Sequence, residues 1–147
     1  MGRVAVLSTG GTIASRAVPG GGSRASLSAS ELLERVPVPE GVRVVGRDVR
    51  RLNSFALTPE DMLDVLTEVR RTLTQPEVDG VVITHGTDAM EETAFFVDLF
   101  HGDERPVVFT GAQRPADAAA PDGPSNLRDA IVVAADPQAR GAGVLDE

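Results

Sequence analysis

Residues 4–14 read VAVLSTGGTIA, and this stretch decides the fold. An apolar run stops abruptly at Thr9, Gly10 and Gly11, and a second hydroxyl follows at Thr12. A run that ends in this way is typical of a buried parallel strand emerging at its carboxyl end. In open α/β sheets, ligands bind at that edge.

A second stretch, residues 81–88, repeats the arrangement as VVITHGTD. Each stretch offers hydroxyls and backbone N–H groups beside glycines, and the second adds the carboxylate of Asp88. This combination suits acyl transfer with a threonine nucleophile, and Thr12 is the candidate. A tight turn followed by a helix N-cap explains the first stretch equally well. A phosphate cradle is a weaker alternative, because neither the Walker pattern nor G-x-G-x-x-G is present.

Strands and helices alternate along the chain. Further strands are expected at Val42–Val49, Val107–Phe109 and from Gly143, and helices from Ser28 to Arg35, from Thr58, from Ala89 to Phe100 and from Asp122 to Ala135. This order predicts an α/β fold with a doubly wound, mostly parallel sheet flanked by helices, of the Rossmann-like type. The segment Thr9–Ser26 carries three consecutive glycines and is expected to be a mobile loop that acts as a lid.

The composition excludes several function classes. The net charge of −8 and the pI near 4.7 argue against nucleic acid or an anionic membrane as a partner. Cysteine is absent, and no His or carboxylate spacing matches a metal site, so no metal and no cofactor are expected. No apolar run has the length of a membrane span, and no signal-like segment precedes the strand that starts at Arg3, which favours a cytoplasmic protein.

Several residues near the second stretch have two interpretations each. Asp88 either binds a substrate ammonium group, orients Thr87, or caps the helix expected from Ala89. His85 is a tempting general base, but a histidine beside glycine is more often structural, hydrogen-bonded through both ring nitrogens. The acids Glu91 and Glu92 suit the first turn of a helix, and one of them is a candidate for the site.

Three further segments complete the candidate list. Ser54 follows the second strand and either binds a substrate carboxylate or satisfies a turn. Gln113–Pro115 and Asp122–Leu127 are interpreted as scaffold: a cap, a proline at a helix start and a buried asparagine.

Taken together, these motifs resemble the bacterial-type L-asparaginase family (asparaginase/glutaminase). Thr9–Ala14 matches the first signature of that family, and His85–Asp88 matches the second, which usually continues with threonine where this chain has Ala89. Gly111–Pro115 and Asp122–Leu127 also resemble family segments. The resemblance covers essentially the whole chain, and two signatures about 75 residues apart make chance agreement improbable.

The resemblance implies roles for individual residues. Thr12 would attack the side-chain amide of asparagine, release ammonia and form a β-aspartyl ester that water hydrolyses. Thr87 and Asp88 would form the second catalytic cluster. Substrate contacts are implied at Gly11, Ser54, Phe55, Gly86, Thr87 and Asp88, with Ser54 on the α-carboxylate and Asp88 on the α-ammonium.

Three departures from the family pattern bear on these roles. The family's mobile loop often carries a tyrosine, and this chain has none. Phe55 stands where many members have glutamine, which removes a polar substrate contact. The family's lysine partner of Thr87 and Asp88 lies beyond residue 147, and all fourteen basic residues here are arginines.

Residues 1–147 are therefore interpreted as the N-terminal catalytic domain of an asparaginase whose smaller C-terminal domain is absent from this chain. We expect the fragment alone to have little or no activity, and the full-length protein to form a homodimer or homotetramer. Two alternatives stay open: a non-catalytic module that binds a small amino acid, and the amidase subunit of a tRNA-dependent amidotransferase.

Overall fold

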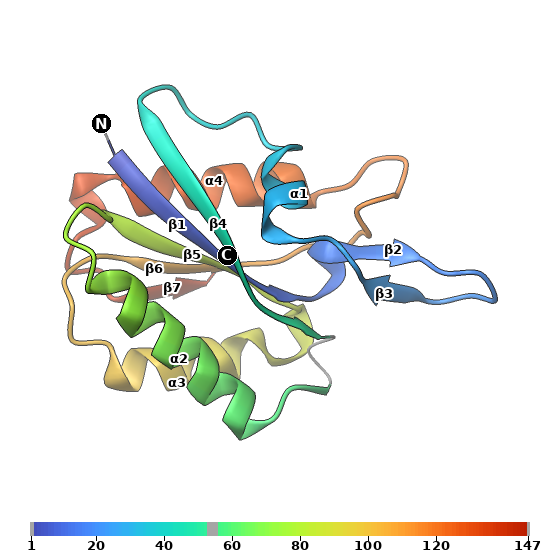
Figure 1. The fold of residues 1–147 in the computed structure, drawn as a ribbon, viewed down its shortest axis with the longest axis horizontal. Coiled ribbons are helices and arrows are strands. Elements are labelled where there is room, and N and C mark those ends of the chain that lie inside the picture. Colours follow the sequence, from blue (N-terminus) through green and yellow to red (C-terminus); the bar gives the residue numbers. More distant parts are fainter. Residues whose placement is uncertain (1, 53–55, 147) are drawn as a thin grey trace.

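The computed structural model describes residues 2–52 and 56–146. Within them, five strands form one parallel sheet in the order β4-β1-β5-β6-β7 (Figure 1). The strands are β1 (Gly2–Gly10), β4 (Val42–Leu52), β5 (Gly80–Thr84), β6 (Val107–Thr110) and β7 (Val144–Asp146). The expected α/β fold with a parallel sheet flanked by helices is confirmed.

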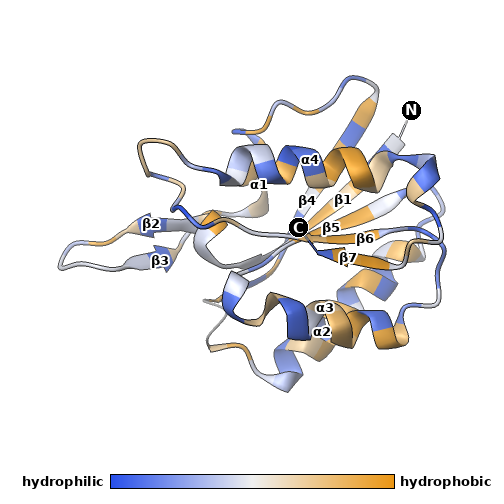
Figure 2. Cartoon of the chain, turned by 180° about the vertical axis from the view of Figure 1, so that it is seen from behind, coloured by the Kyte–Doolittle hydropathy of each residue, from blue (hydrophilic) through white to orange (hydrophobic). Residues whose placement is uncertain are grey.

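Helices cover both faces of the sheet. On one face lie α1 (Ala29–Leu33) and α4 (Gly123–Ala135), and on the other lie α2 (Pro59–Leu73) and α3 (Met90–Phe100) (Figure 1). Side chains of β1 alternate between the two cores, with Val6 on the α1/α4 side and Leu7 on the α2/α3 side. Figure 2 shows the apolar central strands between these helical layers. Burial on both faces explains why β1 reads as a continuous apolar run.

The helix starts follow the capping residues in the sequence. Thr58 accepts a hydrogen bond from the backbone N–H of Asp61, whose carboxylate accepts in return from the N–H of Thr58, and Pro59 opens α2. Ser28 and Glu31 form the same capping box at α1. That helix ends at Leu33, two residues before the expected end, because the next N–H groups turn back to nearer carbonyls.

The topological switch point lies between β1 and β5. The chain leaves β1 for β4 on one side and later returns through α2 to β5 on the other side. At such a reversal the connections diverge from the carboxyl ends of the two strands and leave a crevice. Both glycine-rich stretches of the sequence end here.

The segment Thr9–Ser26 is not a simple loop. After a 3-10 turn, η1 (Thr12–Ala14), it forms an antiparallel hairpin of β2 (Ser15–Ala17) and β3 (Ser23–Ala25). The hairpin projects from the body of the domain (Figure 1). Its strands are too short to show an alternating pattern, and glycines at 20–22 with positive φ make the turn between them.

Candidate active site

The carboxyl ends of β1 and β5 are hydrogen-bonded to one another. Ser8 of β1 lies in register with Thr84 of β5, and the buried Thr9 hydroxyl donates to the carbonyl oxygen of Thr84 at 2.9 Å. On the other side of β1, the N–H of Gly11 donates to the carbonyl of Leu52 at 2.9 Å. The first turn is therefore fixed to both neighbouring strands.

Gly11 brings the two glycine-rich turns into contact. A Cβ on Gly11 would overlap the backbone nitrogen of Gly86 and lie 2.6 Å from its Cα. The φ of Gly11 is +79°, a conformation that L side chains rarely adopt. Only glycine satisfies both conditions, so this residue sets how closely the turns approach.

Thr12 is the first residue of η1 and is half-buried. Its carbonyl accepts from the N–H of Ser15, and the Ser15 hydroxyl donates back to the carbonyl of Gly11 at 2.8 Å. The backbone around Thr12 is thus held by local bonds at the root of the hairpin. The interpretation of the first stretch as a helix N-cap does not hold, because Gly11 stands at the N-cap position of η1 and makes no side-chain bond.

Thr87 and Asp88 lie in η3 (Thr87–Ala89), and both are exposed. Helix α3 starts at Met90, one residue later than expected, with Ala89 at its N-cap. Asp88 is therefore not the N-cap residue of this helix. A Cβ added to Gly111, which follows β6, would lie 3.3 Å from Cγ2 of Thr87 and 2.7 Å from the carbonyl oxygen of His85. The turn of residues 85–87 therefore packs against Gly111 as well as against Gly11.

His85 is fully buried, and its side chain bonds to the backbone of its own turn instead of facing solvent. Its Nδ1 lies 2.7 Å from the carbonyl oxygen of Gly86, which requires that Nδ1 carry the proton. The Nε2 atom has no partner among the described residues, so the expected bonding through both nitrogens is wrong. Burial lowers the pKa of His85, an effect that the Gly86 bond and the charge of Glu92 oppose. Because the imidazole is buried and does not line the pocket described next, His85 is not placed to act as a general base.

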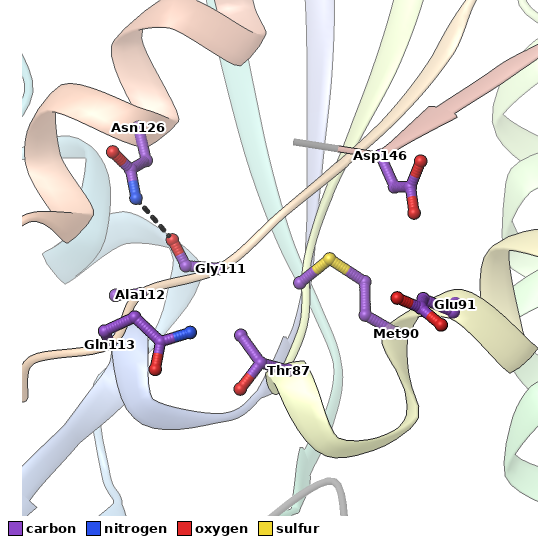
Figure 3. A pocket seen from close by; sticks show the side chains of 8 residues that line it. All are labelled: Thr87, Met90, Glu91, Gly111, Ala112, Gln113, Asn126 and Asp146. Carbon is purple, nitrogen blue, oxygen red and sulfur yellow. Dashed lines mark hydrogen bonds between the residues drawn. The ribbon is translucent and has the colours of Figure 1, made fainter.

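A pocket of about 420 Å³ opens beside Thr87. Figure 3 shows its lining residues, which come from the ends of several elements: Thr87, Met90, Glu91, Gly111, Ala112, Gln113, Asn126 and Asp146. Of the candidates, Thr87 and Glu91 line it, whereas Thr12, Asp88 and Glu92 do not. Sequence reasoning missed the role of Met90, Gln113 and Asp146 as lining residues. The signal was their position at or after the carboxyl ends of strands, on the same edge of the sheet.

The interpretation of the segment after β6 as scaffold holds in part. Asp122 stands at the N-cap position of α4, without a side-chain cap bond, and Pro124 lies in the first turn, but Asn126 is half-buried rather than buried. The Asp122 carboxylate accepts from the N–H groups of Gln113 and Arg114 at 2.9 and 3.0 Å. Desolvation raises the pKa of Asp122, but the bonds from backbone N–H groups outweigh it and leave the pKa below its usual value. The Asn126 amide donates to the carbonyl of Gly111 at 3.0 Å and fixes the rim of the pocket (Figure 3).

Ser54 and Phe55 lie outside the described residues. Leu52, which ends β4 two residues before Ser54, accepts the hydrogen bond from Gly11. Among the described residues, no group of three His, Asp or Glu side chains is placed to hold a metal ion. In the same part of the chain, no helix is long and apolar enough to cross a membrane.

Comparison with known proteins identifies the family. The model of the asparaginase N-terminal domain matches residues 3–145. This chain belongs to the asparaginase family. An L-asparaginase of Bacillus licheniformis is 40% identical over 144 residues, which are 97% of this chain and 45% of that protein. A glutaminase-asparaginase of Pseudomonas aeruginosa is also 40% identical, over 97% of this chain and 41% of its own length.

The fold is that of solved members of the asparaginase family. A probable cytoplasmic L-asparaginase from Campylobacter jejuni superimposes with a TM-score of 0.87 at 34% identity, over 99% of this chain and 44% of that one. The chain thus spans less than half the length of the relatives it matches. In family terms it corresponds to the N-terminal domain.

Proposed function

We propose that the protein to which this chain belongs hydrolyses the side-chain amide of L-asparagine to L-aspartate and ammonia. The observation that carries the proposal is the contact of the two signature turns at the switch point between β1 and β5, made by Gly11 against Gly86. The relatives named L-asparaginase and glutaminase-asparaginase support the same substrate class.

In the proposed reaction, the Thr12 hydroxyl attacks the amide carbonyl carbon. The C–N bond then breaks, the amide nitrogen takes a proton and leaves as ammonia, and a β-aspartyl ester remains on Thr12. Water attacks this ester, releases aspartate and restores the hydroxyl. Backbone N–H groups near Gly11, Thr12 and Thr87 are the candidate donors to the oxyanion that forms in each step.

Substrate binding is assigned to the second turn and to the segment after β4. Asp88 would hold the α-ammonium group and Ser54 the α-carboxylate, with Thr87 completing the second catalytic cluster. Gly11, Gly86 and Phe55 would contact the substrate around its side-chain amide. Exposure of Thr87 and Asp88 at the carboxyl edge of the sheet agrees with a role in contacting a small molecule.

Within residues 1–147, activation of Thr12 must come from a group other than the tyrosine and the lysine that the family resemblance implies. The chain contains neither lysine nor tyrosine, and arginine does not give up its proton at neutral pH. For this reason we expect residues 1–147 alone to release little or no ammonia. The second domain, the assembly as a dimer or tetramer and the cytoplasmic location remain predictions about the full-length protein.

The decisive experiment measures ammonia release from L-asparagine and from L-glutamine by the full-length protein, with Thr12→Ala beside the wild type. We expect Thr12→Ala to lose at least about a thousandfold in kcat while it still binds aspartate. Thr67→Ala, an exposed threonine on α2, is the matched control and should retain full activity. Equal aspartate binding by wild type and Thr12→Ala, with turnover in neither, would instead favour the amino-acid-binding module.

A further inference from the structure

The β2–β3 hairpin carries an unusual pair of charges. Its two strands repeat the sequence Ser-Arg-Ala, and their register places Arg16 directly opposite Arg24. Both arginines are exposed. Although the chain as a whole is acidic, residues 1–30 contain three arginines and no aspartate or glutamate. The hairpin is therefore a local cationic arm on an anionic domain.

The two arginines share one face of the hairpin. The neighbouring pair, Ser15 and Ala25, is buried against the body of the domain, so Arg16 and Arg24 project on the opposite side. Directly opposite residues of an antiparallel pair have Cβ atoms about 4.5–5.5 Å apart, and like charges there are destabilising. A negative charge placed between the two guanidinium groups would remove this repulsion and stabilise the hairpin.

Most other arginines of the chain have protein partners. Nine form ion pairs with acids, namely Arg3, Arg47, Arg50, Arg51, Arg71, Arg105, Arg114, Arg128 and Arg140. Two more, Arg35 and Arg70, donate to backbone carbonyls. Among the described residues, the side chains of Arg16 and Arg24, like that of Arg43 on β4, make neither an ion pair nor a hydrogen bond, but only Arg16 and Arg24 stand opposite one another.

Two acids lie close to the hairpin, and both are already engaged. Glu31 lies within the field of Arg16, but its Oε2 accepts from the N–H and the hydroxyl of Ser28 in the capping box. Asp117 accepts from the backbone N–H of Ala17 at 2.9 Å. Each carboxylate fixes backbone structure at its own position, which leaves the outer face of the paired guanidinium groups to solvent.

We propose that Arg16 and Arg24 together bind a phosphate-type oxyanion, either inorganic phosphate or a phosphomonoester. Guanidinium groups present paired N–H donors that match the oxygens of phosphate. Two guanidinium groups together neutralise a phosphate dianion, whereas a single carboxylate would neutralise only one of the two positive charges. Bound phosphate removes the repulsion across the hairpin and links β2 to β3. Since the hairpin starts immediately after η1, the bound anion also restrains the backbone next to Thr12.

Binding is tested on the full-length protein with inorganic phosphate as the probe. Calorimetry and NMR of the arginine side-chain N–H groups follow titrations with phosphate, O-phosphoserine, acetate and chloride at constant ionic strength. We expect saturable one-to-one binding of phosphate or O-phosphoserine, and their relative affinities identify the free ion or the ester as the preferred source. Acetate, which has a single carboxylate, and chloride should bind at least about tenfold more weakly. Equal binding of all four anions would overturn the proposal.

Two single variants and a matched control assign the site. Arg16→Gln and Arg24→Gln should each weaken phosphate binding at least about tenfold, because each leaves one guanidinium for a dianion. Arg43→Gln removes an exposed arginine of β4 and should bind phosphate as the wild type does. Wild-type affinity in both hairpin variants, or no saturable binding to the wild type, would overturn the proposal.

A charge-reversal variant separates binding from folding of the hairpin. Arg24→Glu places opposite charges across the strands, which stabilises the hairpin without a ligand. We expect slower amide hydrogen exchange in β2 and β3 than in the ligand-free wild type, together with loss of phosphate binding. In the wild type, phosphate should slow the same amides. Phosphate binding retained by Arg24→Glu would contradict the assignment.

Discussion

The backbone of Gly11 lies directly against that of Gly86, although 75 residues separate them in the sequence. A side chain at Gly11 would lie 2.6 Å from the Cα of Gly86 and 2.8 Å from the carbonyl carbon of His85. This contact joins the turn that carries Thr12 to the turn that carries Thr87 and Asp88. It is the geometric basis of the proposed site.

Gly11→Ala should therefore be strongly destabilising. The new methyl group would overlap backbone atoms, which cannot move aside as a flexible side chain could, and the φ of +79° at residue 11 adds strain. We therefore expect a loss of about 3 kcal/mol or more in the free energy of unfolding. Gly21→Ala is the control, because its φ of +98° is equally unusual but nothing lies near its Cβ. Urea denaturation measures both, and similar losses in the two variants would contradict the contact.

The hydrogen bond from Thr9 to the carbonyl of Thr84 should stabilise the same junction. Thr9→Val keeps the shape but leaves a buried carbonyl without this donor, which we expect to cost about 1–2 kcal/mol. In Thr67→Val, the lost bond joins Oγ1 to the carbonyl of Leu63 on the exposed side of α2, and the cost should stay below about 0.5 kcal/mol. Equal costs, measured by urea denaturation, would show that the junction does not depend on this bond.

The pair of Asp103 and Arg105 should make the free energy of unfolding fall in acid. The Arg105 side chain lowers the pKa of Asp103 from 3.8 to about 2, and the same guanidinium donates to the carbonyls of Gln75 and Val78. Because the folded pKa lies below the unfolded one, the stabilisation is complete above about pH 4 and is lost as the pH falls toward 2.

The variant Asp103→Asn removes that step. After allowance for solvent screening, we expect it to cost about 1 kcal/mol at pH 7 and to flatten the free energy of unfolding between about pH 4 and 2. Asp129→Asn, in an exposed pair with Arg128, should change stability by less than about 0.5 kcal/mol. Chemical denaturation at a series of pH values measures both variants. An unchanged acid profile in Asp103→Asn would refute the assignment.

Buried His85 should make stability fall below neutral pH. Burial lowers its folded pKa below the value near 6.5 of the unfolded chain, so the unfolded state takes up the proton first. The free energy of unfolding should decrease as the pH falls from about 6.5 toward the folded pKa. His85→Gln, whose amide stays neutral, should remove this slope, whereas His101→Gln should retain it. The same slope in His85→Gln would assign the proton uptake elsewhere.

Strands β1, β5 and β6 were predictable from sequence because each is an apolar run that ends at a glycine or a threonine. Strand β4 continues to Leu52, three residues past the expected end at Val49, because its pairing with β1 extends the strand beyond its apolar residues. The start of α2 was predictable because Thr58, Pro59 and Asp61 are local capping signals. The hairpin was not, because three-residue strands have no measurable periodicity and gain their structure from the rest of the domain. Ser15, for example, is held by the carbonyl of Gly11 and by the N–H of Ala116, which follows β6.

The sequence by itself determined the fold class, the family and the two turns that carry the candidate residues, since these depend on local runs and on motifs. Only the tertiary structure decided that Gly11 packs on Gly86, that His85 is buried with one ring nitrogen bonded, and that Arg16 faces Arg24. The physical reason is that strand order and register are set by long-range packing, which brings together residues that no sequence pattern relates.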